Sequence, residues 1–111
     1  MIIKVNMLAF ENSKPGHIVV REVEIPDKEF NAANQNGKLE LTFRYGQNDF
    51  QPQRRCSVSV ADVIELDGKL YMVMASGFKE ISQEEFDDFL KMDRRERIFA
   101  GEWDNLYAHD V

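Results

Sequence analysis

Cysteine, basic charge and long apolar runs are all scarce in this chain of 111 residues. The single cysteine, Cys56, cannot form a disulfide within the chain, which favours a reducing compartment. No run approaches the roughly 20 apolar residues that a membrane-spanning helix needs. The start, MIIKVNMLAF, carries one lysine and lacks the small-residue cleavage site of a signal peptide. We therefore expect a cytoplasmic protein with no membrane association.

The charge balance is acidic, with a formal net charge of -6 and an isoelectric point near 4.9. Proteins that bind nucleic acid without sequence preference usually present a basic surface. The balance therefore disfavours a nucleic-acid partner. It fits a soluble protein, a protein that docks on a basic surface, or an acidic mimic of nucleic acid.

Composition and length fit one folded domain over residues 1–111. Hydrophobic residues make up 43% of the chain and charged residues 31%, which is typical of a globular protein and not of a disordered one. A domain of this length holds one modest core. No internal repeat or low-complexity tract divides the chain.

Apolar runs separated by turn residues predict a series of strands. The clearest alternation is KLELTFRY, residues 38–45, which would place Leu39, Leu41, Phe43 and Tyr45 on one dry face. Residues 27–36 could form a short helix or a wide loop. The remaining expected strands are residues 2–10, 17–25, 60–66 and 69–75.

The dipeptide Asp67-Gly68 lies between two apolar runs and predicts a tight hairpin. Both central residues of a type I′ turn need positive φ, which aspartate tolerates and glycine adopts freely. This turn would place Leu66 opposite Lys69. Gly77 then predicts a bend, with Phe78 filling an edge of the core.

A C-terminal helix is predicted to begin at Ser82. Serine followed three residues later by Glu85 is the pattern of a capping box. Phe86, Phe89 and Leu90 form one apolar stripe, and basic residues follow toward the far end, where the helix dipole favours them. The segment after Gly101 could pack back on the sheet or form an apolar tail.

Groups that could carry out catalysis are few and scattered. Cys56, His17 and His109 could in principle supply a nucleophile and a base, but a lone cysteine in a small β-rich domain is usually a buried apolar residue. The acids of the C-terminal helix, Asp87 and Asp88 among them, are typical of a solvated face and not of a metal site. We therefore expect no catalytic, cofactor-binding or metal-binding residues.

One segment combines arginine with aromatic and amide side chains, residues 44–55. Such groups can stack on bases or bind phosphates, and they are equally suited to a protein interface. The plainer alternative is a surface loop whose aromatic side chains pack on the core. The candidate interaction surface consists of Arg44, Tyr45, Phe50, Arg54 and Arg55.

The region from about residue 46 to residue 82 resembles the core motif of YodL-like domains. The run SVSVADVIEL, followed by LYMVMASGFKEI, is similar to the Ser-x-Ser-x-x-Asp run, aromatic strand and Gly-Phe-Lys-Glu corner of that family. The resemblance implies an accessory module of a mobile genetic element and assigns no catalytic residue. The matching positions are Ser57, Val58, Ser59, Val60, Asp62, Val63, Tyr71, Gly77, Phe78, Lys79 and Glu80.

Asp62 can also be explained by folding alone. At the entry to a strand its carboxylate can accept backbone N–H groups and fix the preceding turn. Lys79 and Glu80 could form ion pairs with neighbouring strands, which contribute little when exposed.

The sequence predicts an α+β fold, with a strongly twisted antiparallel sheet of about five strands and a C-terminal helix. The sheet could curl into a partial barrel. The function expected is that of a non-enzymatic protein-interaction module of a plasmid, conjugative element or phage. The alternative is a small nucleic-acid-binding barrel that uses the arginine and aromatic loop. The expected core consists of Phe43, Val63, Leu66, Tyr71, Val73, Phe78, Phe86 and Phe89.

Overall fold

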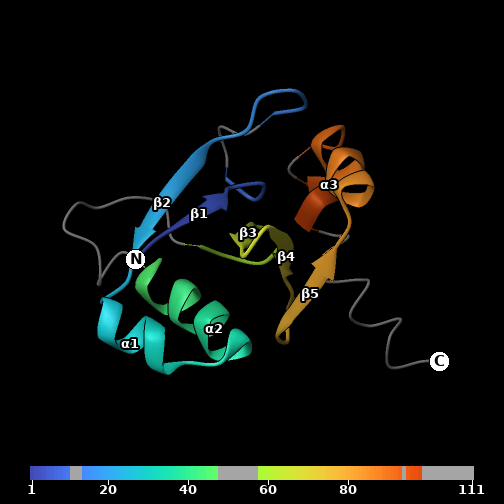
Figure 1. Cartoon of the computed structure of the whole chain (residues 1–111). Coiled ribbons are helices and arrows are strands. Elements are labelled where there is room, and N and C mark those ends of the chain that lie inside the picture. The colour runs from blue at the N-terminus through green and yellow to red at the C-terminus, as the bar shows by residue number, and fades with distance from the viewer. Residues whose placement is uncertain (11–13, 48–57, 94, 99–111) are drawn as a thin grey trace.

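The computed structural model describes residues 1–10, 14–47, 58–93 and 95–98. Among them five strands and three helices form an α+β fold (Figure 1). A further helical turn occupies residues 95–98. The elements are β1 Ile2–Asn6, β2 Val20–Glu24, α1 Asp27–Ala32, α2 Gln35–Tyr45, β3 Val63–Leu66, β4 Lys69–Val73, β5 Phe78–Ile81 and α3 Gln83–Leu90.

The strands form one antiparallel sheet in the order β2-β1-β3-β4-β5. Strand β1 lies between β2, which follows it in the chain, and β3, which begins more than fifty residues later. The sheet is open, with β2 and β5 at its edges, so it does not close into a barrel. The fifth strand, β5, comes from the segment that the sequence predicted to be only a bend at Gly77.

The predicted hairpin between β3 and β4 is confirmed. Asp67 and Gly68 both have positive φ, 53° and 76°, as a type I′ turn requires. The register pairs Leu66 with Lys69 and Ile64 with Tyr71. The first two strands, β1 and β2, also pair with each other, with Ile3 opposite Val23.

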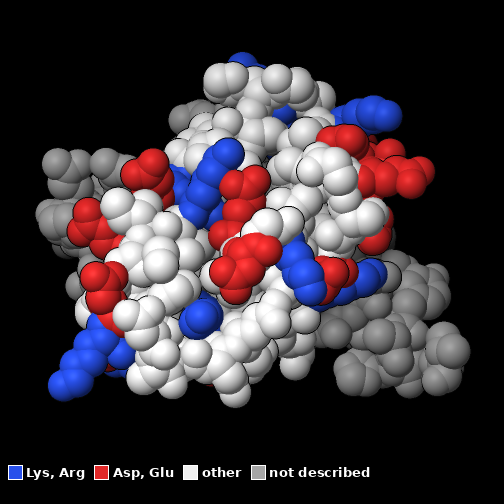
Figure 2. Space-filling view, viewed as in Figure 1, with Lys and Arg blue, Asp and Glu red and all other residues white. Residues whose placement is uncertain are grey.

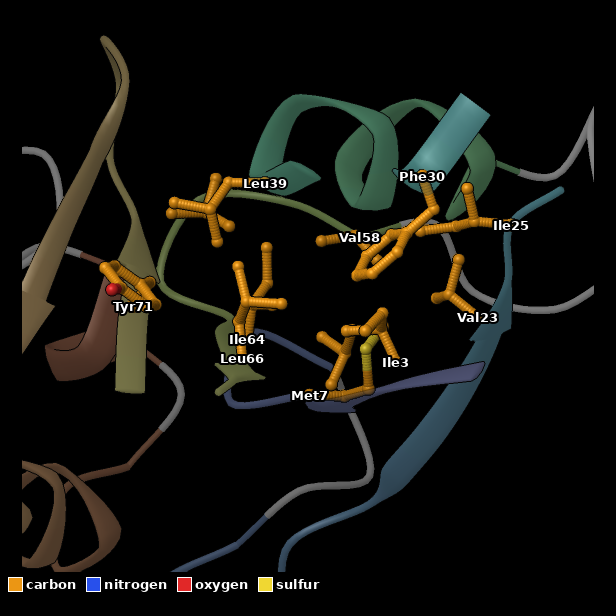
Figure 3. Packing of buried hydrophobic residues seen from close by; sticks show 12 residues of the cluster. Ile3, Met7, Val23, Ile25, Phe30, Leu39, Val58, Ile64, Leu66 and Tyr71 are labelled. Atoms are coloured by element: carbon orange, nitrogen blue, oxygen red, sulfur yellow. The ribbon is translucent and has the colours of Figure 1, made fainter. Parts of the chain in front are cut away.

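Helices cover both faces of the sheet. Helices α1 and α2 lie together on one side and α3 on the other (Figure 1). Beneath α1 and α2, Phe30 and Leu39 point toward the strand residues Ile3, Val23 and Ile64 (Figure 3). Beneath α3, a second cluster is built from Leu8, Val63, Met72, Met74, Ile81 and Phe86. The sheet is therefore apolar on both faces where it meets a helix.

Residues 38–45 form most of α2, so the strand predicted there is wrong. Asn34 caps this helix by accepting a hydrogen bond from the Gly37 N–H at 2.8 Å. Along α2 the buried residues are Leu39 and Thr42, three residues apart, whereas Phe43 is 36% exposed. Residues three apart lie on the same face of a helix, so burial along α2 follows the helical period and not the alternation of apolar and polar residues in KLELTFRY.

The range that the sequence left open, residues 27–36, is helical at both ends. It contains α1 and the first residues of α2, with a short turn at Ala33 and Asn34 between them. The single buried side chain described in α1 is that of Phe30. This residue anchors the short helix on the sheet.

Most of the expected core is confirmed, and one member is not. Phe43 lies on the solvent side of α2 and is not a core residue. Phe78 and Phe89 are partly buried and pack at the margins of the two clusters. The buried members are Val63, Leu66, Tyr71, Val73 and Phe86.

Candidate functional site

The candidate residues that the structure describes lie on a helix and not on a loop. Arg44 and Tyr45 form the last turn of α2, where Arg44 is exposed and Tyr45 is half-buried against the core. Phe50, Arg54 and Arg55 lie outside the described residues, as does the segment after Gly101. The structure therefore places Tyr45 in a definite setting and does not test the arginine and aromatic group as a whole.

Tyr45 lines a groove of about 530 Å³ at one corner of the molecule, near the point marked N in Figure 1. The groove lies where the end of β2, the start of α1 and the end of α2 meet the first residues of the chain. We call this the corner groove. Its walls are formed by Met1, Ile2, Glu24, Ile25, Pro26, Asp27 and Tyr45.

Polar contacts hold the walls of the corner groove in place. The Met1 amine donates a hydrogen bond to the Ile25 carbonyl oxygen at 2.9 Å and forms an ion pair with the Asp27 carboxylate. The Tyr45 hydroxyl donates to the Glu29 carboxylate, and this hydrogen bond raises the pKa of Tyr45. The groove is thus lined by apolar side chains together with the carboxylates of Glu24 and Asp27.

Part of the sheet beside the corner groove is exposed to solvent. Side chains on one face of β1 and β2 lie beyond the area that α3 covers, and the apolar Ile2 and Val20 are 55% and 47% exposed there. Charged side chains surround them, and Lys4 pairs with Glu65 of β3 at 3.5 Å. We call this surface the open face. Its members are Ile2, Lys4, Val20, Glu22 and Glu24.

The sequence contained a signal for the open face, although the prediction did not use it. In VREVE, residues 20–24, exposure alternates along the strand, because the structure exposes Val20, Glu22 and Glu24 while burying Arg21 and Val23. Val20 breaks the rule that the wet side of a strand is polar. An apolar residue on the wet side of an edge strand is the feature that could have marked this surface.

Charges of both signs are mixed on one side of the molecule. On the side seen in Figure 2, the described lysine and arginine side chains lie interspersed with aspartate and glutamate side chains. A second groove of about 520 Å³, next to the Asp67-Gly68 turn, has the same character. It is lined by Glu65, Asp67, Lys69 and Glu80, of which Lys69 and Glu80 form an exposed pair at 3.8 Å.

Asp62 is fully buried and connects two loops. One carboxylate oxygen accepts the Ala9 N–H at 2.9 Å and the other accepts the Ser59 N–H at 2.8 Å. Burial raises the pKa of Asp62 to about 6, although both hydrogen bonds and the charge of Arg21 act in the opposite direction. The role predicted for Asp62, fixing the turn before a strand through backbone N–H groups, is confirmed.

Two buried arginines hold the fold together. The Arg97 guanidinium donates to the Phe89 and Leu90 carbonyl oxygens at the end of α3, at 2.8 and 3.0 Å, and to the Leu8 carbonyl oxygen at 3.3 Å. Burial lowers its pKa. Arg21 of β2 donates to the Gly46 carbonyl oxygen at 2.6 Å. Both side chains therefore act inside the fold, each linking segments that lie far apart in the chain.

Within the described residues no three histidine, cysteine, aspartate or glutamate side chains gather in a way that could hold a metal ion. Helices long and apolar enough to cross a membrane are likewise absent from the described part of the chain. The features that remain are surfaces: the corner groove and the open face.

Comparison of the chain with protein-family models, with curated proteins and with solved structures gave no significant match. The resemblance to YodL-like domains therefore stays a prediction that depends on the motif itself.

Proposed function

We propose that this chain is a non-enzymatic protein-interaction module that docks on a partner protein through the open face and the corner groove. The observation that carries the proposal is the exposure of large apolar side chains along the β1–β2 hairpin, at the corner groove and on the open face. Met1, Ile2 and Val20 are 47%, 55% and 47% exposed, and they account for three of the four exposed large apolar side chains among the described residues. Exposed apolar area of this kind, rimmed by charge, is typical of interaction sites.

The mobile-element context is part of the same proposal and depends on the motif. The described motif positions have structural roles: Asp62 connects two loops, and Gly77 adopts a φ of 82° at the turn before β5. This supports reading the motif as the signature of a fold. If the context is right, genes that flank this one should encode conjugation, mobilisation or phage functions, and an ordinary metabolic neighbourhood would count against it.

The alternative, a nucleic-acid-binding barrel, has less support. The sheet is open, and the described charges in Figure 2 are interspersed instead of forming a continuous basic face. A surface that tracks a phosphate backbone needs clustered lysine and arginine.

Affinity capture with matched surface variants tests the proposal. The tagged protein, an Ile2→Ser/Val20→Thr double variant and a Phe43→Ser variant are each incubated with host lysate, and the retained proteins are quantified by mass spectrometry. Phe43 is the matched control, because it is also an exposed large apolar residue but lies on α2. The parent and Phe43→Ser should retain the same specific protein, and the double variant should lose it.

Two results would contradict the proposal. If the parent retains no protein above a tag-only control, the interaction function is wrong. If Phe43→Ser loses the partner and the double variant keeps it, binding takes place on α2 and the surface assigned here is wrong.

A further inference from the structure

The outer edge of β2 presents backbone groups that no described residue pairs. Hydrogen bonds from Ile25 to Met1 and from Met7 to Val19 show which β2 residues face β1. Because hydrogen-bonded pairs recur at every second residue of an antiparallel ladder, Arg21 and Val23 also direct their backbone groups toward β1. The N–H and C=O groups of Val20, Glu22 and Glu24 consequently point outward. Within the described part of the chain no hydrogen bond is made to these outward groups.

The side chains of the same three residues give this edge a charge pattern. Val20, Glu22 and Glu24 are all exposed and all lie on the open face. A strand added beside β2 would place its own alternate side chains directly opposite these three. Lysine or arginine opposite Glu22 and Glu24 would be attracted, and an apolar residue would fit opposite Val20.

In the registers centred within β2, a second copy of this chain fits the same edge poorly. Two β2 strands paired around a two-fold axis at residue 22 would place Glu22 opposite Glu22. Centring the axis on residue 23 places Glu22 opposite Glu24, and centring it on residue 21 places Arg21 opposite Arg21. Like charges directly opposite one another destabilise a strand pair, so these three registers disfavour self-association, while the edge stays open to another sequence.

We infer that the edge of β2 binds an extended, basic segment of a partner protein by strand addition. This inference depends on the proposed function and names the chemistry of the partner. Main-chain hydrogen bonds to Val20, Glu22 and Glu24 supply the binding, and the two glutamates select lysine or arginine at alternate positions. The corner groove begins where β2 ends, at Glu24 and Ile25, so a side chain just beyond the added strand can enter it.

A synthetic peptide tests the inference without knowledge of the natural partner. The probe is a short, capped peptide with lysine at two successive alternate positions and valine elsewhere, titrated into isotope-labelled protein at low salt. Binding should slow the hydrogen exchange of the outward amides of Val20, Glu22 and Glu24. The edge of β5 is the internal control: the amides of Phe78 and Glu80 point outward there, and their exchange should not change.

Charge reversal tests the selection. Glu22→Lys with Glu24→Lys should weaken binding of the lysine peptide by about tenfold or more and strengthen binding of the matching glutamate peptide, because two cross-strand pairs change sign. Glu84→Lys, an exposed site on α3, should change neither affinity. A lysine peptide with methylated alternate amides, which cannot pair along one edge, should not protect β2.

The results separate this inference from the proposed function. Any of three results would overturn strand addition. The parent could bind the lysine and glutamate peptides with equal affinity, the peptide could protect the β5 amides, or millimolar peptide could leave the β2 amides unprotected. A specific partner that is captured by the open face would still support an interaction module. If only the capture experiment fails, the proposed function is wrong, and peptide binding at the edge of β2 would then have no assigned biological role.

Discussion

A charged side chain with no access to solvent sits at position 62, where it joins the loop after β1 to the loop before β3. Its two carboxylate oxygens satisfy two backbone N–H groups, from Ala9 and Ser59. Buried charge is unfavourable, and hydrogen bonds only partly offset the loss of hydration. This is why the pKa of Asp62 is raised to about 6 from an ordinary value of 3.8.

The raised pKa predicts how stability depends on pH. The folded state binds this proton more tightly than the unfolded chain, so the contribution of Asp62 is complete below pH 3.8 and is lost as the pH rises through about 6. Relative to Asp62→Asn, the parent should gain on the order of 1 kcal/mol in free energy of unfolding between pH 7 and pH 5. Urea unfolding of both proteins measures this gain. A difference that stays constant over that range, or that shrinks at pH 5, would contradict the prediction.

The function of Asp62 could be predicted because it acts on its own neighbourhood. An aspartate three residues after a serine and just before an apolar run can accept nearby N–H groups whatever the rest of the fold. The contacts of Arg97 could not be predicted in the same way. Its position after the C-terminal helix suggested favourable charge, but its contact with Leu8 depends on how distant segments pack.

Among the elements, the β3–β4 turn has its conformation specified by two residues. A Cβ atom at Gly68 would meet no atom within 4 Å, so any penalty for a side chain there arises from the positive φ and not from crowding. Gly68→Val should lower the free energy of unfolding by about 1 kcal/mol or more, because a β-branched residue resists that conformation. Asp67→Asn is the control, since asparagine tolerates positive φ, and its thermal melt should match that of the parent. A Gly68→Val melt equal to the parent's would rule out the turn as the reason for glycine.

Helix α3 begins with a reciprocal capping box, as predicted. The Ser82 hydroxyl accepts the Glu85 N–H at 3.1 Å, and the Glu85 carboxylate accepts the Ser82 N–H at 3.3 Å. Ser82→Ala should destabilise the protein by on the order of 1 kcal/mol and Glu85→Ala by less. The two effects should be smaller together than their sum, because each residue positions the other. A double-mutant cycle that is fully additive would show that the two hydrogen bonds do not depend on each other.

Elements marked by turn or capping residues could be predicted from the sequence. The segment KLELTFRY could not, because its apolar residues fit both the strand period and the helix period. In KLELTFRY, Leu39 and Phe43 are four residues apart, as are Leu41 and Tyr45, so an alternating run of eight residues also contains helical spacing. The helix is favoured because Asn34 caps its start and because Lys38, Leu39 and Glu40 have high helix propensity. Strand β5 was not predicted for another reason. FKEI is short and half exposed, so its own sequence has no clear strand pattern, and its hydrogen-bonded pairing with β4 stabilises it as a strand.

At the scale of the whole molecule, the net charge predicts whether the protein binds nucleic acid. We expect no binding to random duplex or single-stranded DNA at physiological salt, meaning a Kd weaker than about 100 μM, because a net charge of -6 repels a polyanion. Fluorescence anisotropy with labelled DNA measures this. Micromolar binding that is abolished by Arg54→Ala with Arg55→Ala would place the nucleic-acid hypothesis first.

The candidate site could not be predicted as a site, because it exists only after folding. Met1, Ile25 and Tyr45 lie far apart in the sequence, and no spacing rule joins them. The sheet order brings Ile25 beside Met1, and the packing of α2 adds Tyr45. Composition and turn chemistry indicated the fold class, whereas the groove depends on how three separate segments meet.

The position of β1 in the sheet has a consequence for how the protein comes apart. Strands β1 and β2 form one local hairpin, and β3, β4 and β5 form a local meander, so a single strand pairing, β1 with β3, joins the two in the sheet. Local hairpins close quickly, whereas a pairing between distant segments must first overcome the entropy of a long loop. The β1–β3 pairing is therefore the junction at which two fragments of this protein could be separated and reassembled.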